Sequence, residues 1–240
     1  MKKLFQKDPV IFAVVWIAGY VWLFANADAL SETIGIPKLL TVIVGLLLSI
    51  FLFGFLRKNE LLGYSGLCKT STRLPRFWFI PLLILSSVNF WNGLTDNMPA
   101  GETTLFILSM CCVGFLEEVI FRGLLFKGMC KSNVTAAIIV SSLTFGMGHI
   151  INLLLGEPIL DTLLQLIYAS AVGFCYTALF HISGSILPCI ISHAFINSTS
   201  AFAIEPTPSG QILIAAIQTV FGISYGIWLL RSKEHTDGSL

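Results

Sequence analysis

The sequence predicts an all-α, polytopic membrane protein with eight transmembrane helices and with both termini in the cytoplasm. Of its 240 residues, 55% are hydrophobic and only 11% are charged, and the mean hydropathy is +0.86. A soluble domain carries roughly 25% charged residues, so this composition indicates a bilayer environment. Apolar runs of about 20 residues, the length of helix that spans a bilayer, recur along the chain. We therefore expect a single integral-membrane domain over residues 1–240, in a multi-pass protein of the cell membrane.

Eight apolar runs follow one another, and each predicts one transmembrane helix. The third is interrupted by Pro81 and Asn89. None of the runs shows the short polar–apolar alternation of a membrane-spanning β-strand. The first run, with bases before it and Ala25-Asn26-Ala27 near its end, also resembles a cleavable signal peptide, but its length favours a retained helix. The runs are 10–26, 39–56, 77–94, 104–126, 134–155, 160–180, 185–203 and 212–230.

The lysines and arginines predict the orientation of these helices. If the N-terminus is inside, the opposite loops hold only one base, Lys38, among several acidic residues. Short loops rich in Lys and Arg remain in the cytoplasm, so both termini are predicted to be cytoplasmic. The net charge of +1 gives no sign of a nucleic-acid partner. The cytoplasmic bases are then Lys2, Lys3, Lys7, Arg57, Lys58, Lys69, Arg73, Arg76, Lys127, Lys131, Arg231 and Lys233.

Two carboxylates and one arginine lie inside the fourth apolar run. Ionisable residues within a bilayer are costly, so they are candidates for function. Glu118 and Arg122 are four residues apart and share a helix face, which predicts a salt bridge that supports the site. Glu117 is rotated by about 100° and lacks that partner, so we expect it to be the general base. The alternative is that all three residues form a packing clip between helices.

Two histidines and an asparagine lie in other runs, His149 in the fifth and His193 with Asn197 in the seventh. His193 and Asn197 share one helix face, and two converging donors suit an oxyanion hole. Gly146 and Gly148 beside His149 would allow a neighbouring backbone to approach closely. The alternative for His193 and Asn197 is a hydrogen bond between helices.

If the fourth, fifth and seventh helices pack together, Glu117, His149, His193 and Asn197 share one water-filled cavity. That set is the inventory for peptide-bond hydrolysis by an activated water molecule. Asn152, one turn beyond His149, is the expected supporting residue.

Three motifs occur in order between residues 104 and 203: EExxxR at 117–122, FxxxH at 145–149 and HxxxN at 193–197. Together they resemble the CAAX-protease and bacteriocin-processing family, which includes type II CAAX prenyl endopeptidases and abortive infection proteins. The resemblance implies an eight-helix intramembrane endopeptidase with an active site that opens toward the cytoplasm. It also implies that Glu117 activates water with help from His149, while His193 and Asn197 hold the oxyanion.

The resemblance further implies a membrane-associated peptide or protein substrate, either a prenylated CAAX type or a leader or bacteriocin type. The family was historically classed as metallopeptidases, and a later view treats it as glutamate peptidases. The sequence lacks HExxH spacing, so we favour no metal cofactor, with Zn²⁺ bound by Glu117, His149 and His193 as the alternative.

Two other functions compete with the peptidase. One is a non-catalytic membrane immunity or regulatory protein that binds a peptide in the same cavity. The other is a small transporter, which would also use intramembrane carboxylates, although the sequence shows no inverted repeat.

Overall fold

The structure is a computed structural model that describes residues 1–70 and 76–237, with side chains for residues 1–70 and 78–232. Within these ranges the chain is helical, and its only strand-like pairing is one isolated bridge between Leu94 and Ala203. The all-α prediction is therefore confirmed. Arg73 and the side chains of Arg76 and Lys233, three of the predicted cytoplasmic bases, lie outside the described residues.

Six helical segments of the described chain are long and apolar enough to cross a membrane. They confirm six of the eight predicted spans and a multi-pass membrane protein. A short helix, α1 (Lys2–Lys7), precedes them. The six are α2 (Pro9–Ile34), α3 (Leu39–Lys58), the segment Ala100–Met129, the segment Val134–Leu154, α9 (Ile159–Ser183) and the apolar part, Pro208–Ser232, of α11 (Pro208–Asp237).

The third and seventh predicted spans are not full-length helices. The third is made of η1 (Arg76–Phe79), α4 (Ile80–Ser86) and η2 (Val88–Phe90), and the seventh of α10 (Leu187–Thr199) and η5 (Ser200–Phe202). Pro81 lies in the first turn of α4, where its missing N–H interrupts no helical hydrogen bond. The Asn89 amide donates to the Ile196 carbonyl and the Thr199 hydroxyl, so the broken segment packs on α10.

The segment Ala100–Met129 changes its winding beside the acidic pair. It runs as α5 (Ala100–Glu117), continues as the π-helix η3 (Glu118–Phe126) and ends in α6 (Lys127–Met129). The prediction had assumed one regular α-helix here. All nine residues of η3 are buried, and the Ser141 hydroxyl donates to the Phe121 carbonyl within it at 2.9 Å. Such π-helical turns often occur at functional sites.

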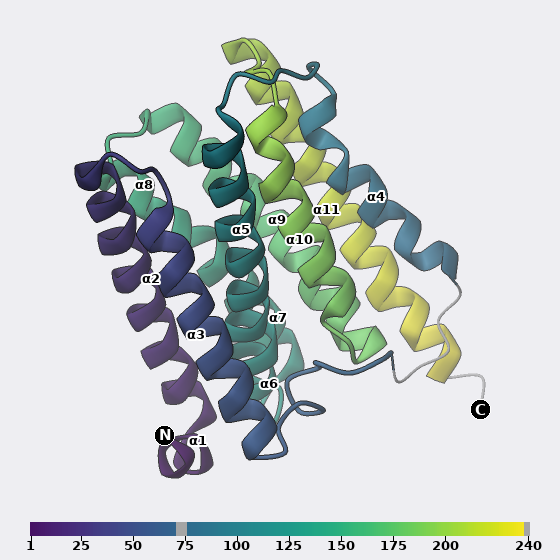
Figure 1. Cartoon of the computed structure of the whole chain (residues 1–240). Coiled ribbons are helices and arrows are strands. Elements are labelled where there is room, and N and C mark those ends of the chain that lie inside the picture. The colour runs from purple at the N-terminus through teal and green to yellow at the C-terminus, as the bar shows by residue number, and fades with distance from the viewer. Residues whose placement is uncertain (71–75, 238–240) are drawn as a thin grey trace.

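The bundle has two ends, which we call the terminal end and the loop end. The terminal end contains α1, α6, the C-terminal ends of α3, α9 and α11, and the connections 59–70 and 184–186 (Figure 1). The loop end contains the connections 35–38, 91–99, 155–158 and 203–207, and the Thr95 N–H donates to the Phe202 carbonyl there at 2.8 Å. α7 (Val134–Met147), η4 (Gly148–Ile150) and α8 (Ile151–Leu154) approach this loop end.

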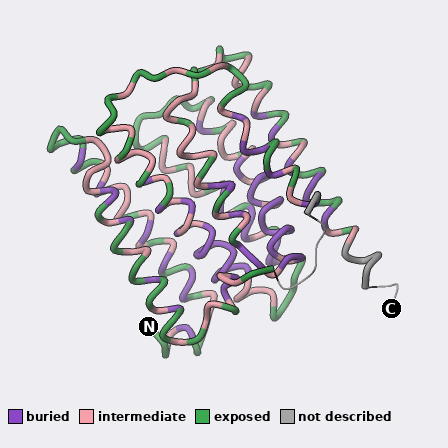
Figure 2. Tube along the Cα trace, turned by 45° about the vertical axis from the view of Figure 1, so that its right-hand side comes forward, coloured by how far each residue is buried: buried purple, intermediate pink, exposed green. Residues whose placement is uncertain are grey.

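The buried chain segments lie in the middle of the bundle (Figure 2). Many of the exposed side chains are large and apolar. Leu47, Ile50, Ile191 and Val220 are more than 60% exposed. Contact with lipid removes the cost of exposing such side chains to water, which agrees with a membrane location.

Candidate active site

Helix α10 lies against α5 because of a glycine one turn before the acidic pair. A Cβ atom at Gly114 would lie 2.8 Å from the backbone nitrogen of Ala194. Any larger residue would push the two helices apart. The contact brings His193, the neighbour of Ala194, beside Glu117 and Glu118.

Glu118 is fully buried and contacts two side chains, Arg122 and His193. Its Oε1 accepts from Arg122 Nη1 at 3.0 Å and from His193 Nδ1 at 2.9 Å. The side chains of Glu118 and Arg122 are both 0% exposed. The predicted salt bridge is therefore present, whereas the contact with His193 was not expected.

This contact defines the orientation of the His193 ring. A carboxylate only accepts hydrogen bonds, so Nδ1 of His193 carries a proton and donates it to Glu118. The other ring nitrogen, Nε2, then lies 3.8 Å from Oε2 of Glu117. Second partners of this kind commonly fix the tautomer and orientation of a functional histidine.

Arg122 and the two histidines are separated by the phenylalanine of the FxxxH motif. The guanidinium carbon of Arg122 lies 4.1 Å from the centre of the Phe145 ring. The same ring meets His149 and His193 edge to face, with centroids 6.0 and 5.5 Å apart. Arg122 Nη2 also donates to the Gly173 carbonyl at 3.2 Å. The Phe145 ring thus packs against both imidazoles, and its face stabilises the positive charge of the buried Arg122 guanidinium.

Glu117 has a different environment from its neighbour. Its side chain is 15% exposed, and its Oε1 accepts from the Tyr20 hydroxyl at 2.7 Å. Sequence reasoning missed Tyr20, although a tyrosine within an apolar helix needs a hydrogen-bond partner and could have been considered. The contact makes α2 part of the site. The Ala25-Asn26-Ala27 stretch lies inside α2, which continues to Ile34.

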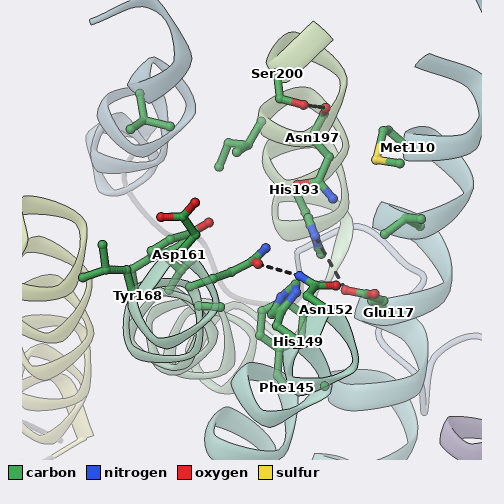
Figure 3. A pocket seen from close by; sticks show the side chains of 18 of the residues that line it. Met110, Glu117, Phe145, His149, Asn152, Asp161, Tyr168, His193, Asn197 and Ser200 are labelled. Atoms are coloured by element: carbon green, nitrogen blue, oxygen red, sulfur yellow. Dashed lines mark hydrogen bonds and ion pairs between the residues drawn. The ribbon is translucent and has the colours of Figure 1, made fainter. Parts of the chain in front are cut away.

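One cavity of about 670 Å³ contains the predicted catalytic residues (Figure 3). Glu117, His149, His193 and Asn197 all line it, and they come from α5, η4 and α10. The structure thus brings together the four residues that the sequence had selected from three separate runs. A volume of several hundred Å³ is typical of a pocket for a small ligand or a short peptide segment.

Asn152 also lines the cavity, and its amide donates to Gln165 Oε1 at 2.7 Å. It therefore joins α8 to α9 beside His149. The expectation for the two glycines is half right. A Cβ at Gly146 would lie 2.7 Å from the Leu166 carbonyl oxygen, which indicates a close approach, but one at Gly148 would meet nothing within 4 Å.

The alternative zinc site does not fit the side chains. Among the residues that the structure describes, no group of three or more His, Cys, Asp or Glu could hold a metal ion. Nε2 of His193 and Oε2 of Glu117 lie 3.8 Å apart, but no third ligand of the described chain joins this pair.

The cavity extends from Glu117 to the loop end of the bundle. Asp28, Lys38, Asn92, Asp161 and Pro206 line its outer part. Two expectations therefore conflict, because a site that opens toward the cytoplasm and termini that lie in the cytoplasm would need a cavity at the terminal end. The two cannot both hold.

Comparison with known proteins agrees with the motif pattern. Residues 99–199 match the family model of the type II CAAX prenyl endopeptidase Rce1-like proteins. No curated protein and no solved structure matches the chain. The matched residues run from the residue before α5 to the end of α10 and include every motif residue of the site. The matched region of the chain, residues 99–199, is therefore similar to the type II CAAX prenyl endopeptidase Rce1-like family, which is a family of proteases.

Proposed function

We propose that this chain is an intramembrane endopeptidase that cleaves a membrane-associated peptide with a water molecule activated by Glu117. The family match supports a peptidase. The observation that carries the mechanism is the contrast within the acidic pair. Glu118 is enclosed and paired, whereas Glu117 faces a cavity that also contains two imidazoles and an amide.

Glu117 is the proposed general base. Tyr20 donates to one of its oxygens, which holds the carboxylate in place and leaves the other oxygen near the cavity. A water molecule between Glu117 and His149 gives its proton to Glu117 as its oxygen attacks the carbonyl carbon of the peptide. Glu117 then returns the proton to the departing amine, so protons balance over the cycle.

The oxyanion is stabilised by Asn197 and His193 in this proposal. The Asn197 amide donates as a neutral group. With Nδ1–H of His193 directed at Glu118, Nε2 can donate only when the ring is an imidazolium. In that form the ring is a charged donor, which stabilises developing negative charge more strongly than a neutral one.

The same proposal includes an eight-pass topology in the cell membrane. α3 finishes at the terminal end and α5 begins at the loop end, so the segment with α4 runs from one end to the other (Figure 1). Likewise, α9 finishes at the terminal end and α11 begins at the loop end, so α10, which lies between them in the chain, runs from one end to the other. The short helices α4 and α10 would then complete eight crossings and place both termini on one side, which the basic residues identify as cytoplasmic.

The test compares membrane-bound and released peptides from cells that express the wild type, Glu117→Gln or Glu102→Gln. Glu102 is a matched control, because it lies on α5 but does not line the cavity. We expect uncleaved substrate to accumulate with Glu117→Gln alone. Cleavage at the wild-type rate by purified Glu117→Gln protein would overturn the role of Glu117. If no peptide differs between the three strains, the non-catalytic peptide-binding alternative is favoured.

A further inference from the structure

The cavity reaches one end of the bundle, the loop end. Its outer lining residues, such as Asp28, Lys38 and Asp161, belong to the ends of α2, α3 and α9 that meet at the loop end. Within the described ranges, none of its lining residues comes from the connections 59–70, 130–133 or 184–186 at the terminal end. A substrate therefore reaches Glu117 through the loop end.

A dry layer separates the cavity from the terminal end. Ile120, Leu124 and Phe126 of η3 are at most 1% exposed, as are Phe180 and Ile186 from α9 and the start of α10. They belong to one apolar cluster, and the rings of Phe126 and Phe180 pack edge to face with centroids 5.8 Å apart. A polar peptide backbone cannot pass such a layer without losing its hydrogen bonds to water.

The charges of the two ends differ sharply. Apart from Arg122 in the middle of the bundle, every described lysine and arginine but Lys38 lies at the terminal end. Lys38 itself pairs with Asp28 at 2.8 Å. Short Lys- and Arg-rich segments stay in the cytoplasm, so the loop end faces the other side of the membrane.

We infer that the cavity admits its substrate from the non-cytoplasmic side of the membrane. The substrate class is then a peptide segment in or near the outer half of the bilayer, such as part of a secreted or membrane-anchored precursor. A cytoplasmic protein with a lipid-modified C-terminus could not present its scissile bond to Glu117. The direction of access follows from the cavity and the charges, whereas the assignment of a substrate rests on the peptidase function proposed above.

Cysteine labelling tests the direction of access without any need for activity. Asp161→Cys places a thiol in the cavity mouth, Glu157→Cys places one on the loop end outside the cavity, and Ser132→Cys places one at the terminal end. Each is treated with a membrane-impermeant thiol reagent in intact and in lysed cells, and label is scored above that of the parent with its native cysteines.

The expected result is that Asp161→Cys and Glu157→Cys gain as much label in intact cells as after lysis, whereas Ser132→Cys gains label only after lysis. The reverse pattern would overturn the inference, since the mouth would then face the cytoplasm. Label at Glu157→Cys without label at Asp161→Cys would overturn it as well, because the loop end would be outside while the cavity stayed closed.

The positions of cleavage test the substrate class. New peptide termini that depend on Glu117 should lie in segments of membrane or secreted proteins on the non-cytoplasmic side. If these termini lie in cytoplasmic segments, the inference is wrong while the peptidase function stands. If no terminus depends on Glu117, the proposed function fails, and the labelling result still decides the direction of access.

Discussion

Two adjacent layers of the bundle each contain one glutamate, but they surround its carboxylate differently. In the enclosed layer, Glu118 is completely buried and is held by Arg122 and His193. In the cavity layer one residue earlier, Glu117 keeps one carboxylate oxygen near open space and is fixed through the other by Tyr20. The difference teaches that the partners and the exposure of an intramembrane carboxylate decide its role. A fully buried carboxylate that pairs with a cation inside the protein supports the fold, and one that faces a cavity is available for chemistry.

The largest effect that would sharpen this contrast is the loss of catalysis in Glu117→Gln. The amide keeps the shape and the bond from Tyr20 but cannot accept a proton, so cleavage should fall by about 10²- to 10⁴-fold. Thermal unfolding in detergent should be close to that of the wild type. If the Glu117→Gln protein cleaved at the wild-type rate, Glu117 would not be the general base, and the proposed difference in role between Glu117 and Glu118 would be wrong.

In the enclosed layer, Glu118→Gln should act on stability. The amide oxygen can still accept from His193, but Arg122 becomes a buried charge without a counter-charge, which costs about 3–5 kcal/mol. The measurement is the unfolding midpoint in detergent. Adding Arg122→Met should restore much of the lost stability, because the unpaired charge is gone. A single variant as stable as the wild type would show that Glu118 is no more structural than Glu117.

The contact that joins the two layers depends on Gly114. In Gly114→Ala the new methyl group meets the backbone of α10, so the helices must separate, at a cost of about 1–3 kcal/mol and with reduced cleavage. Gly101→Ala, on the same helix with nothing near its Cβ, is the matched control and should be neutral or slightly stabilising. Equal behaviour of the two variants would contradict a role for close packing.

A smaller effect is expected from Tyr20→Phe. Loss of one hydrogen bond to a charged group, worth about 1.5 kcal/mol, should reduce cleavage roughly tenfold and leave the fold intact. Tyr64→Phe is the control, because the Tyr64 hydroxyl has no partner among the described residues and lies at the terminal end. Burial raises the pKa of Tyr64 to about 12, so its hydroxyl stays protonated near neutral pH and the change removes no charge. An equal loss in both variants would mean that Tyr20 does not act through Glu117.

The sequence alone was sufficient for features that follow from local spacing. Runs of about 20 apolar residues predicted the six long spans, because helix length is set by the thickness of the hydrocarbon core. The interval of four residues predicted the pairing of Glu118 with Arg122. The three motifs contain all four residues that were predicted to be catalytic, and these four residues line one cavity.

Only the tertiary structure decided features that depend on which helices touch. No local pattern indicated that Tyr20, 97 residues away, would bond Glu117, or that His193 would contact both carboxylates. The breaks in the third and seventh spans follow from packing of α4 against α10, which supplies polar partners that a lone helix in lipid would lack. The direction of the cavity emerged in the same way. The charges predict which end of the bundle faces the cytoplasm, but only the packed bundle shows that the cavity extends to the loop end and that an apolar layer lies on its other side.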